Sequence, residues 1–168
     1  YCEDGSVDVM NMAWGGICGN NKVALNITES HKTSKNIKER GAFTISVADV
    51  PHLEESDYFG TASANRVKDK FEKSGMHAVK SERVDAPIIE EYPITLECKV
   101  SKIYNDDEGF RVVGEIVNVL VDEEVLDSNG KVDPTKLNAF VFDQFQNGYY
   151  AIGEKVGEAW KSGNKYIK

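Results

Sequence analysis

Apolar and polar residues alternate along several short stretches of the chain, a pattern typical of strands with one buried face. Val23, Leu25 and Ile27 alternate with polar or small residues across positions 22–28. The same period of two recurs at 43–47 and at 94–100. After a turn at 105–109 the chain returns as a long strand over 110–121, so the last two strands predict an antiparallel hairpin.

Short helices are expected between these strands. Thr33 and Ser34 are good N-cap residues for a helix that ends at Gly41. Further helices are predicted at 50–59, at 67–74 and from Asp133-Pro134 onward. The Gly-Thr-Ala-Ser stretch at 60–63 is expected to break the second helix, and positions 76–93 and 140–157 show no clear period.

The pattern predicts a mainly β fold with inserted helices. About six strands, joined mostly antiparallel in a Greek-key-like order, favour a small closed or partly split β-barrel. A length of 168 residues suits one domain over 1–168 with a single sizeable core. The opening YCEDGSVD resembles the end of a strand and a hairpin turn, so we expect that an N-terminal strand is missing from the numbered chain.

Charge and cysteine content narrow the function classes. The net charge of −8 argues against nucleic acid or an anionic membrane as a partner, and no apolar run is long enough to cross a bilayer. The three cysteines form no CxxC pair, which is typical of reduced thiols in a cytoplasmic protein.

Motifs for hydrolysis or for nucleotide loops are absent from the sequence. It contains no GxGxxG, GxxxxGK[ST], HExxH or GxSxG, and its three histidines are far apart in sequence. Nothing in the sequence resembles a hydrolytic triad.

A basic segment at 32–40 stands out in this acidic chain. It holds three lysines and an arginine against one acid, and hydroxyls of Ser30, Thr33 and Ser34 gather where its helix should begin. A helix N-terminus with hydroxyls and lysines can bind a phosphate, although a solvated helix face is the alternative. The loop at 60–63, followed by Arg66, Lys68 and Lys70, has the same two interpretations.

The segment 9–18 combines sulfur, aromatic and glycine residues. Met10, Met12 and Trp14 are spaced by two, and Gly15-Gly16 would let a flat ligand approach the backbone. Core packing is the alternative for these side chains. A flavin suits such a site, because its ring carries the electrons and the protein need only orient it.

The stretches NMAWGGIC, KVALNI, SHKTSKNI, YFGTAS, DKFEKSG, APIIEEYPITLECKV and YYAIGEKVG occur in this order along nearly the whole chain. Together they resemble the flavin reductase-like FMN-binding split-barrel family, and the flavoredoxin subgroup in particular. The resemblance implies a six-stranded antiparallel split barrel, a homodimer with FMN near the subunit interface, and electron transfer through the flavin.

The resemblance also implies a set of cofactor-binding residues. Asn11, Met12, Ala13 and Trp14 would line the ring and the ribityl chain. Ser30, His31, Lys32 and Thr33 would hold the phosphate. Gly60, Thr61, Ala62 and Ser63 would close over the cofactor, with Lys70 reaching it. Many relatives have Ser-Gly where this chain has Ser63-Ala64, and Cys18 near the flavin is expected to be a buried structural thiol.

The sequence thus predicts an FMN-dependent oxidoreductase that takes electrons from a reduced nicotinamide or a redox-protein donor. No catalytic residue is assigned, and no metal site is expected. A flavin-binding or storage module without turnover is the alternative, since no nicotinamide site is recognisable. A weaker alternative is another planar ligand, such as pyridoxal phosphate or haem.

Overall fold

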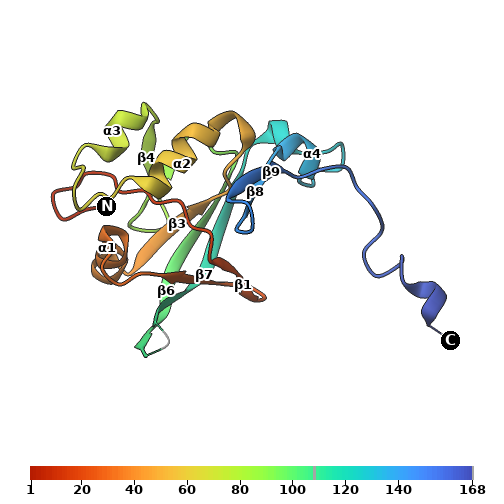
Figure 1. The fold of residues 1–168 in the computed structure, drawn as a ribbon, viewed down its shortest axis with the longest axis horizontal. Helices are drawn as coiled ribbons and strands as arrows, with labels where there is room; N and C mark the ends of the chain where they lie inside the picture. Colours follow the sequence, from red (N-terminus) through yellow and green to blue (C-terminus); the bar gives the residue numbers. More distant parts are fainter. Residues whose placement is uncertain (108, 168) are drawn as a thin grey trace.

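The centre of the molecule is an antiparallel sheet of five strands (Figure 1). The computed structural model describes residues 1–107 and 109–167. The sheet order is β1-β2-β7-β6-β3. The bounds are β1 Gly15–Gly19, β2 Lys22–Ile27, β3 Ala42–Ser46, β6 Ile94–Asp106 and β7 Gly109–Val121.

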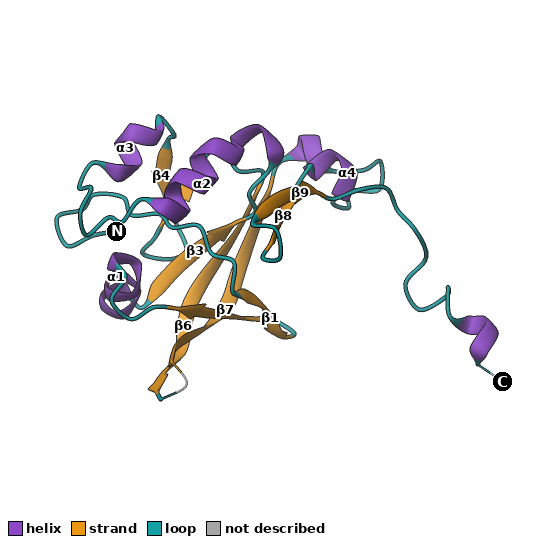
Figure 2. Ribbon diagram, viewed as in Figure 1, coloured by secondary structure: helices purple, strands orange, loops and turns teal. Residues whose placement is uncertain are grey.

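Helices and two small sheets surround this sheet (Figure 2). The α-helices are α1 Lys32–Arg40, α2 Leu53–Thr61, α3 Lys70–Ser74 and α4 Pro134–Leu137. The 3-10 turns are η1 Val50–His52, η2 Glu123–Val125 and η3 Asn164–Tyr166. The small antiparallel sheets pair β4 Ala78–Lys80 with β5 Pro87–Ile89, and β8 Phe140–Asp143 with β9 Gly148–Ala151.

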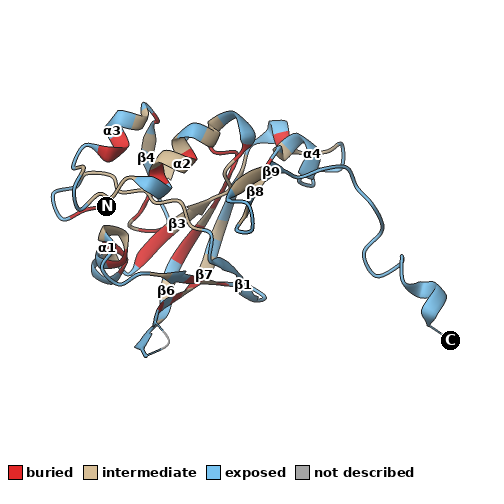
Figure 3. Cartoon of the chain, in the orientation of Figure 1, coloured by how far each residue is buried: buried red, intermediate tan, exposed pale blue. Residues whose placement is uncertain are grey.

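The alternating pattern places one face of the five-stranded sheet in the core. Figure 3 shows buried residues on the strands of this sheet. Leu25 pairs with Val112, which is fully buried, and Phe43 pairs with the fully buried Cys98. Ile37 of α1 joins the same cluster. A second cluster, which includes Phe59 of α2, packs α2 and α3 beside it.

Gly114 shows how tightly the first cluster is packed. A Cβ atom built on this glycine would lie 2.9 Å from Cε1 of Phe43 and 3.3 Å from Cβ of Cys98. The Phe43 ring therefore occupies the space that a side chain at position 114 would need.

The predicted mainly β fold is confirmed, but the main sheet has five strands. In the described residues β1 and β3 each pair on one side only, so these strands do not close a barrel. The strand at 22–28, the strand at 43–47 and the long hairpin are present as β2, β3 and β6–β7. The expected turn at 105–109 is tighter, because β6 continues to Asp106, and its residue 108 lies outside the described residues.

Several local predictions were wrong in detail. His31 rather than Thr33 or Ser34 is the N-cap of α1, while Gly41 ends this helix at φ 64° as expected. Gly60 lies inside α2 and does not break it. The segments without a clear period contain the short strands β4, β5, β8 and β9. Within the described part of the chain, no helix has the length and apolar character needed to span a bilayer.

Candidate functional site

Residues 7–14 form an extended segment that is held between α1 and α2. Asp8 Oδ2 accepts hydrogen bonds from Thr33 Oγ1 at 2.8 Å and Asn36 Nδ2 at 3.0 Å. Further along, the carbonyl oxygen of Trp14 accepts a bond from the backbone N–H of Asn26 at 2.8 Å. These contacts fix both ends of the segment that carries the predicted ring-binding residues.

This segment forms one wall of a cavity of about 740 Å³. Asn11, Met12, Ala13 and Trp14 all line it, and so does His31 at the start of α1. The opposite wall comes from the end of the β6–β7 hairpin, through Tyr104, Asp106, Gly109, Phe110 and Arg111. The volume is within the range that holds a cofactor of nucleotide size.

The N-terminus of α1 opens beside this cavity. His31 is its N-cap, and no side chain caps it. The first backbone bond of the helix runs from Lys35 N–H to the His31 carbonyl at 3.3 Å, so the N–H groups of residues 32–34 precede the regular bonding pattern. Such N–H groups and the helix dipole favour an anion.

Two of the three predicted hydroxyl ligands at this helix, those of Thr33 and Ser34, are already engaged. Thr33 donates to Asp8, and Ser34 Oγ donates to the Thr28 carbonyl at 2.6 Å. The Ser30 carbonyl accepts a bond from Asn65 Nδ2 at 2.9 Å. The backbone N–H groups, the Ser30 hydroxyl and the Lys32 ammonium are therefore the groups at this end of α1 that could bind an anion. Of residues 30–33, only His31 lines the cavity itself.

The third predicted segment reaches the site through its first residue. A Cβ atom on Gly60 would lie 3.2 Å from Cβ of Asn11, so a glycine allows α2 to approach the ring-binding segment closely. Thr61, Ala62 and Ser63 do not line the cavity, although Asn65 joins their loop to Ser30.

Lys70 is buried and connects two of the predicted segments. Its Nζ atom donates to the Val9 carbonyl at 2.7 Å and to the Phe59 carbonyl at 2.8 Å. Burial lowers the pKa of Lys70, and the nearby Asp8 charge opposes this shift. Lys70 does not line the large cavity, so in this structure it positions the backbone before Asn11 and at the end of α2.

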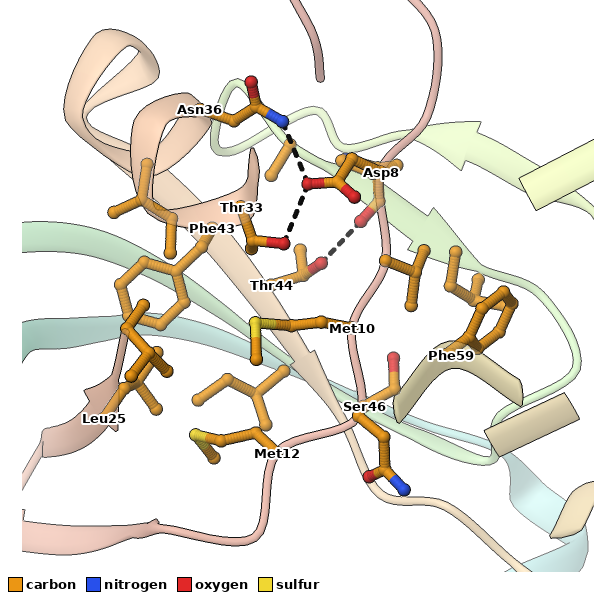
Figure 4. A pocket seen from close by; sticks show the side chains of 18 of the residues that line it. Asp8, Met10, Met12, Leu25, Thr33, Asn36, Phe43, Thr44, Ser46 and Phe59 are labelled. Carbon is orange, nitrogen blue, oxygen red and sulfur yellow. Dashed lines mark hydrogen bonds between the residues drawn. The ribbon is translucent and has the colours of Figure 1, made fainter. Parts of the chain in front are cut away.

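A second, smaller cavity of about 180 Å³ lies on the other side of the extended segment (Figure 4). Met10 and Met12 point into this cavity. The core residues Leu25 and Phe43 line it on one side and Phe59 lines it on the other. Met12 also packs against the main core cluster. Met12 thus contributes to core packing, and both methionines also line the large cavity.

The contribution of the β6–β7 hairpin to the cavity was not predicted from the sequence. Tyr104 and Arg111 are paired in register, and Arg111 Nε donates to Asn26 Oδ1 at 2.8 Å. The two residues lie in an alternating hairpin more than seventy positions from Trp14, and only the strand register brings them to the cavity.

Cys18 is exposed on β1, so the expectation of a buried thiol was wrong. Cys2 and Cys98 are the buried thiols, and burial together with the Glu97 charge raises the pKa of Cys98 to about 12. Only Cys18 can thus present a reactive thiolate in the folded chain.

This difference predicts the outcome of thiol titration. Ellman's reagent is expected to modify one thiol per folded chain quickly and all three after denaturation. A Cys18→Ser variant should lose the fast phase. Fast reaction of two thiols in the native protein would contradict the burial of Cys2 and Cys98.

A family model described as "Flavin reductase like domain" matches residues 7–139. The chain belongs to this family. The match begins with the extended segment and includes the α1 N-terminus, Lys70 and the β6–β7 hairpin.

Solved structures of flavoredoxins share the fold. The chain is 34% identical to flavoredoxin of Desulfovibrio vulgaris (Miyazaki F), with a TM-score of 0.91 over 97% of this chain and 88% of that one. Flavoredoxin from Methanosarcina acetivorans is 25% identical, with a TM-score of 0.86 over 95% and 84% of the two chains. An uncharacterized protein of Archaeoglobus fulgidus is 34% identical over 93 residues, which cover 55% of this chain and about half (52%) of that relative.

Proposed function

We propose that this protein is an FMN-dependent oxidoreductase that passes electrons from a reduced nicotinamide or a redox-protein donor to an acceptor. The observation that carries the proposal is the uncapped N-terminus of α1 beside the cavity lined by Asn11–Trp14. Membership of a family whose members bind FMN-type flavins supports it. A split barrel of six strands, as the resemblance implies, is part of the same proposal.

The residues present fit a planar group with a phosphate tail. The backbone N–H groups of residues 32–34 and the Lys32 ammonium would hold the phosphate. Asn11 and the backbone through Trp14 would orient the ring, with Tyr104 and Arg111 on the opposite wall. The flavin, when bound, supplies the electron-carrying chemistry, and these side chains bind it, orient it and exclude water.

Absorption spectra taken before and after a reduced donor is added distinguish this function from its alternatives. The purified protein, or the protein given FMN, should show a flavin absorption spectrum that bleaches anaerobically when a reduced donor is added. Flavin binding without donor oxidation above the rate of free flavin would favour the storage module. Protein that takes up no FMN would reject both.

Replacing Lys32 by Ala should weaken FMN binding by roughly 1–3 kcal/mol, because charge-assisted phosphate contacts have about this strength. Titration of each variant with FMN, followed by fluorescence, measures the change. Lys38→Ala is the matched control, because Lys38 lies in the last turn of α1 and is paired with Glu29. Equal affinities of wild type and Lys32→Ala would place the phosphate elsewhere.

We also propose a homodimer and a cytoplasmic location. Exposed apolar residues such as Trp14, Ile17 and Val119 support a second subunit. The three free cysteines support a reducing compartment.

A further inference from the structure

The chain after β9 leaves the rest of the molecule (Figure 1). We call residues 153–167 the C-terminal arm and residues 1–152 the body. The last hydrogen bond before the arm begins lies within the body and runs from Ile152 N–H to the Ala139 carbonyl at 3.0 Å. Among the described residues, the hydrogen bonds, ion pairs and ring contacts of the arm all join two arm residues, such as Lys155 with Glu158 and Lys165 with Tyr166.

The arm carries exposed apolar side chains although it makes no hydrogen bond, ion pair or ring contact with the described residues of the body. Trp160 is 96% exposed, and Val156, Tyr166 and Ile167 are exposed as well. Burial of large aromatic side chains is favourable and is one way in which a chain terminus becomes tied down. In the single chain these side chains have no covering surface.

The arm is nevertheless locally ordered. Glu158 accepts backbone bonds from Lys161 at 3.2 Å and Ser162 at 3.0 Å, and a 3-10 turn follows at Asn164–Tyr166. The alignment with the Desulfovibrio flavoredoxin covers 97% of this chain, which leaves out about five residues, fewer than the fifteen of the arm. Most of the arm therefore lies within the part of the chain that aligns with this solved structure.

Charge indicates which surface covers the arm. The arm contains three Lys and two Glu, and one further Lys follows it in the sequence. Residues 153–168 thus carry a net charge of +2, while residues 1–152 carry −10. A second copy of the chain offers an acidic body to this basic arm. Nucleic acid and anionic membranes would repel the body that the arm belongs to.

We propose that two copies of this chain exchange their C-terminal arms, each arm docking on the body of the other copy. Trp160 is the main anchor, with Val156 and Tyr166 beside it, because buried aromatic residues contribute most to such contacts. A two-fold dimer makes this contact twice. The inference rests on the proposed homodimer and does not depend on the flavin site.

The first test measures mass against concentration for the full chain by light scattering. Wild type should be a dimer. In a Val156→Ser/Trp160→Ser variant the dissociation constant of the dimer should rise by about 30-fold or more, which is the effect of losing an anchor residue. Phe145→Ser is the matched control, because Phe145 is an 89% exposed aromatic residue of the body. A dimer equally stable in all three proteins, or weakened equally by both variants, would overturn the proposal.

The second test locates Trp160 itself. Trp14 and Trp160 are the two tryptophans, so a Trp14→Phe variant reports on Trp160 alone. Its acrylamide quenching should fall several-fold when the protein is concentrated and should recover on dilution, in step with the mass.

The outcomes distinguish failure of the proposed arm exchange from failure of the proposed homodimer. A dimer in which Trp160 remains fully quenched refutes the arm exchange and leaves the dimer standing. A monomer at every concentration refutes both. Protection that is independent of concentration, or that requires added anionic vesicles, would mean that the arm folds on its own body or binds membranes, and either result overturns the proposal.

Discussion

Replacing Lys70 by Met is expected to lower the free energy of unfolding by about 2–4 kcal/mol, because each buried carbonyl left without a donor costs about 1–3 kcal/mol. The two carbonyls are those of Val9 and Phe59. FMN affinity should fall by at least about tenfold, since the backbone before Asn11 loses its anchor and binding sites tolerate displacements of only about 0.5 Å. Denaturant unfolding and FMN titration measure the two effects.

Lys73→Met is the matched control, because Lys73 lies on the same helix with its side chain 56% exposed. It should change both quantities little. If the Lys70→Met variant kept the stability and the FMN affinity of the wild type, the buried ammonium would not position the site.

The pH dependence of stability provides a further signature of Lys70. Burial lowers its pKa from 10.5, so the unfolded chain binds more protons than the folded chain between the lowered pKa and 10.5. Stability contributed by this group therefore rises with pH across that window. The Lys70→Met variant should lack this rise, which urea unfolding at a series of alkaline pH values measures.

Gly114→Val is expected to destabilise the fold by about 2–3 kcal/mol, because overpacking a filled core costs about 1–3 kcal/mol and sometimes more. The new side chain would collide with the Phe43 ring and approach Cβ of Cys98. Thermal or denaturant unfolding measures the loss.

Gly16→Val serves as the control for this substitution, since a Cβ atom at Gly16 meets nothing within 4 Å. Adding Phe43→Leu to Gly114→Val should recover part of the stability, because the smaller side chain frees space. A Gly114→Val protein as stable as wild type would contradict the packing described for the sheet.

Elements with a strong period were predictable from the sequence, and short elements were not. The alternation at 22–28 and the long hairpin predicted β2, β6 and β7, because one face of each strand is buried over several residues. The strands β4, β5, β8 and β9 have three or four residues, too few to show a period. Their positions depend on tertiary contacts, such as the bond from Thr44 Oγ1 to the Pro87 carbonyl at 2.6 Å.

The candidate site likewise has one part that was predictable from the sequence and one part that was not. The ring-binding segment and the basic helix were recognisable because glycines, a tryptophan and lysines concentrate there. The opposite wall with Tyr104 and Arg111 was not, because strand register brings it to the cavity. The engagement of Thr33 by Asp8 was equally hidden, since these residues are 25 positions apart.

The proposed function requires a phosphate-binding site where α1 begins, beside the ring-binding segment. Parallel titrations of the protein with FMN and with riboflavin, which lacks the phosphate, measure what this site contributes. FMN should bind about 100-fold more tightly, a difference of about 2.7 kcal/mol, and Lys32→Ala should remove much of the difference. Equal binding of the two flavins, or binding of neither, would contradict it.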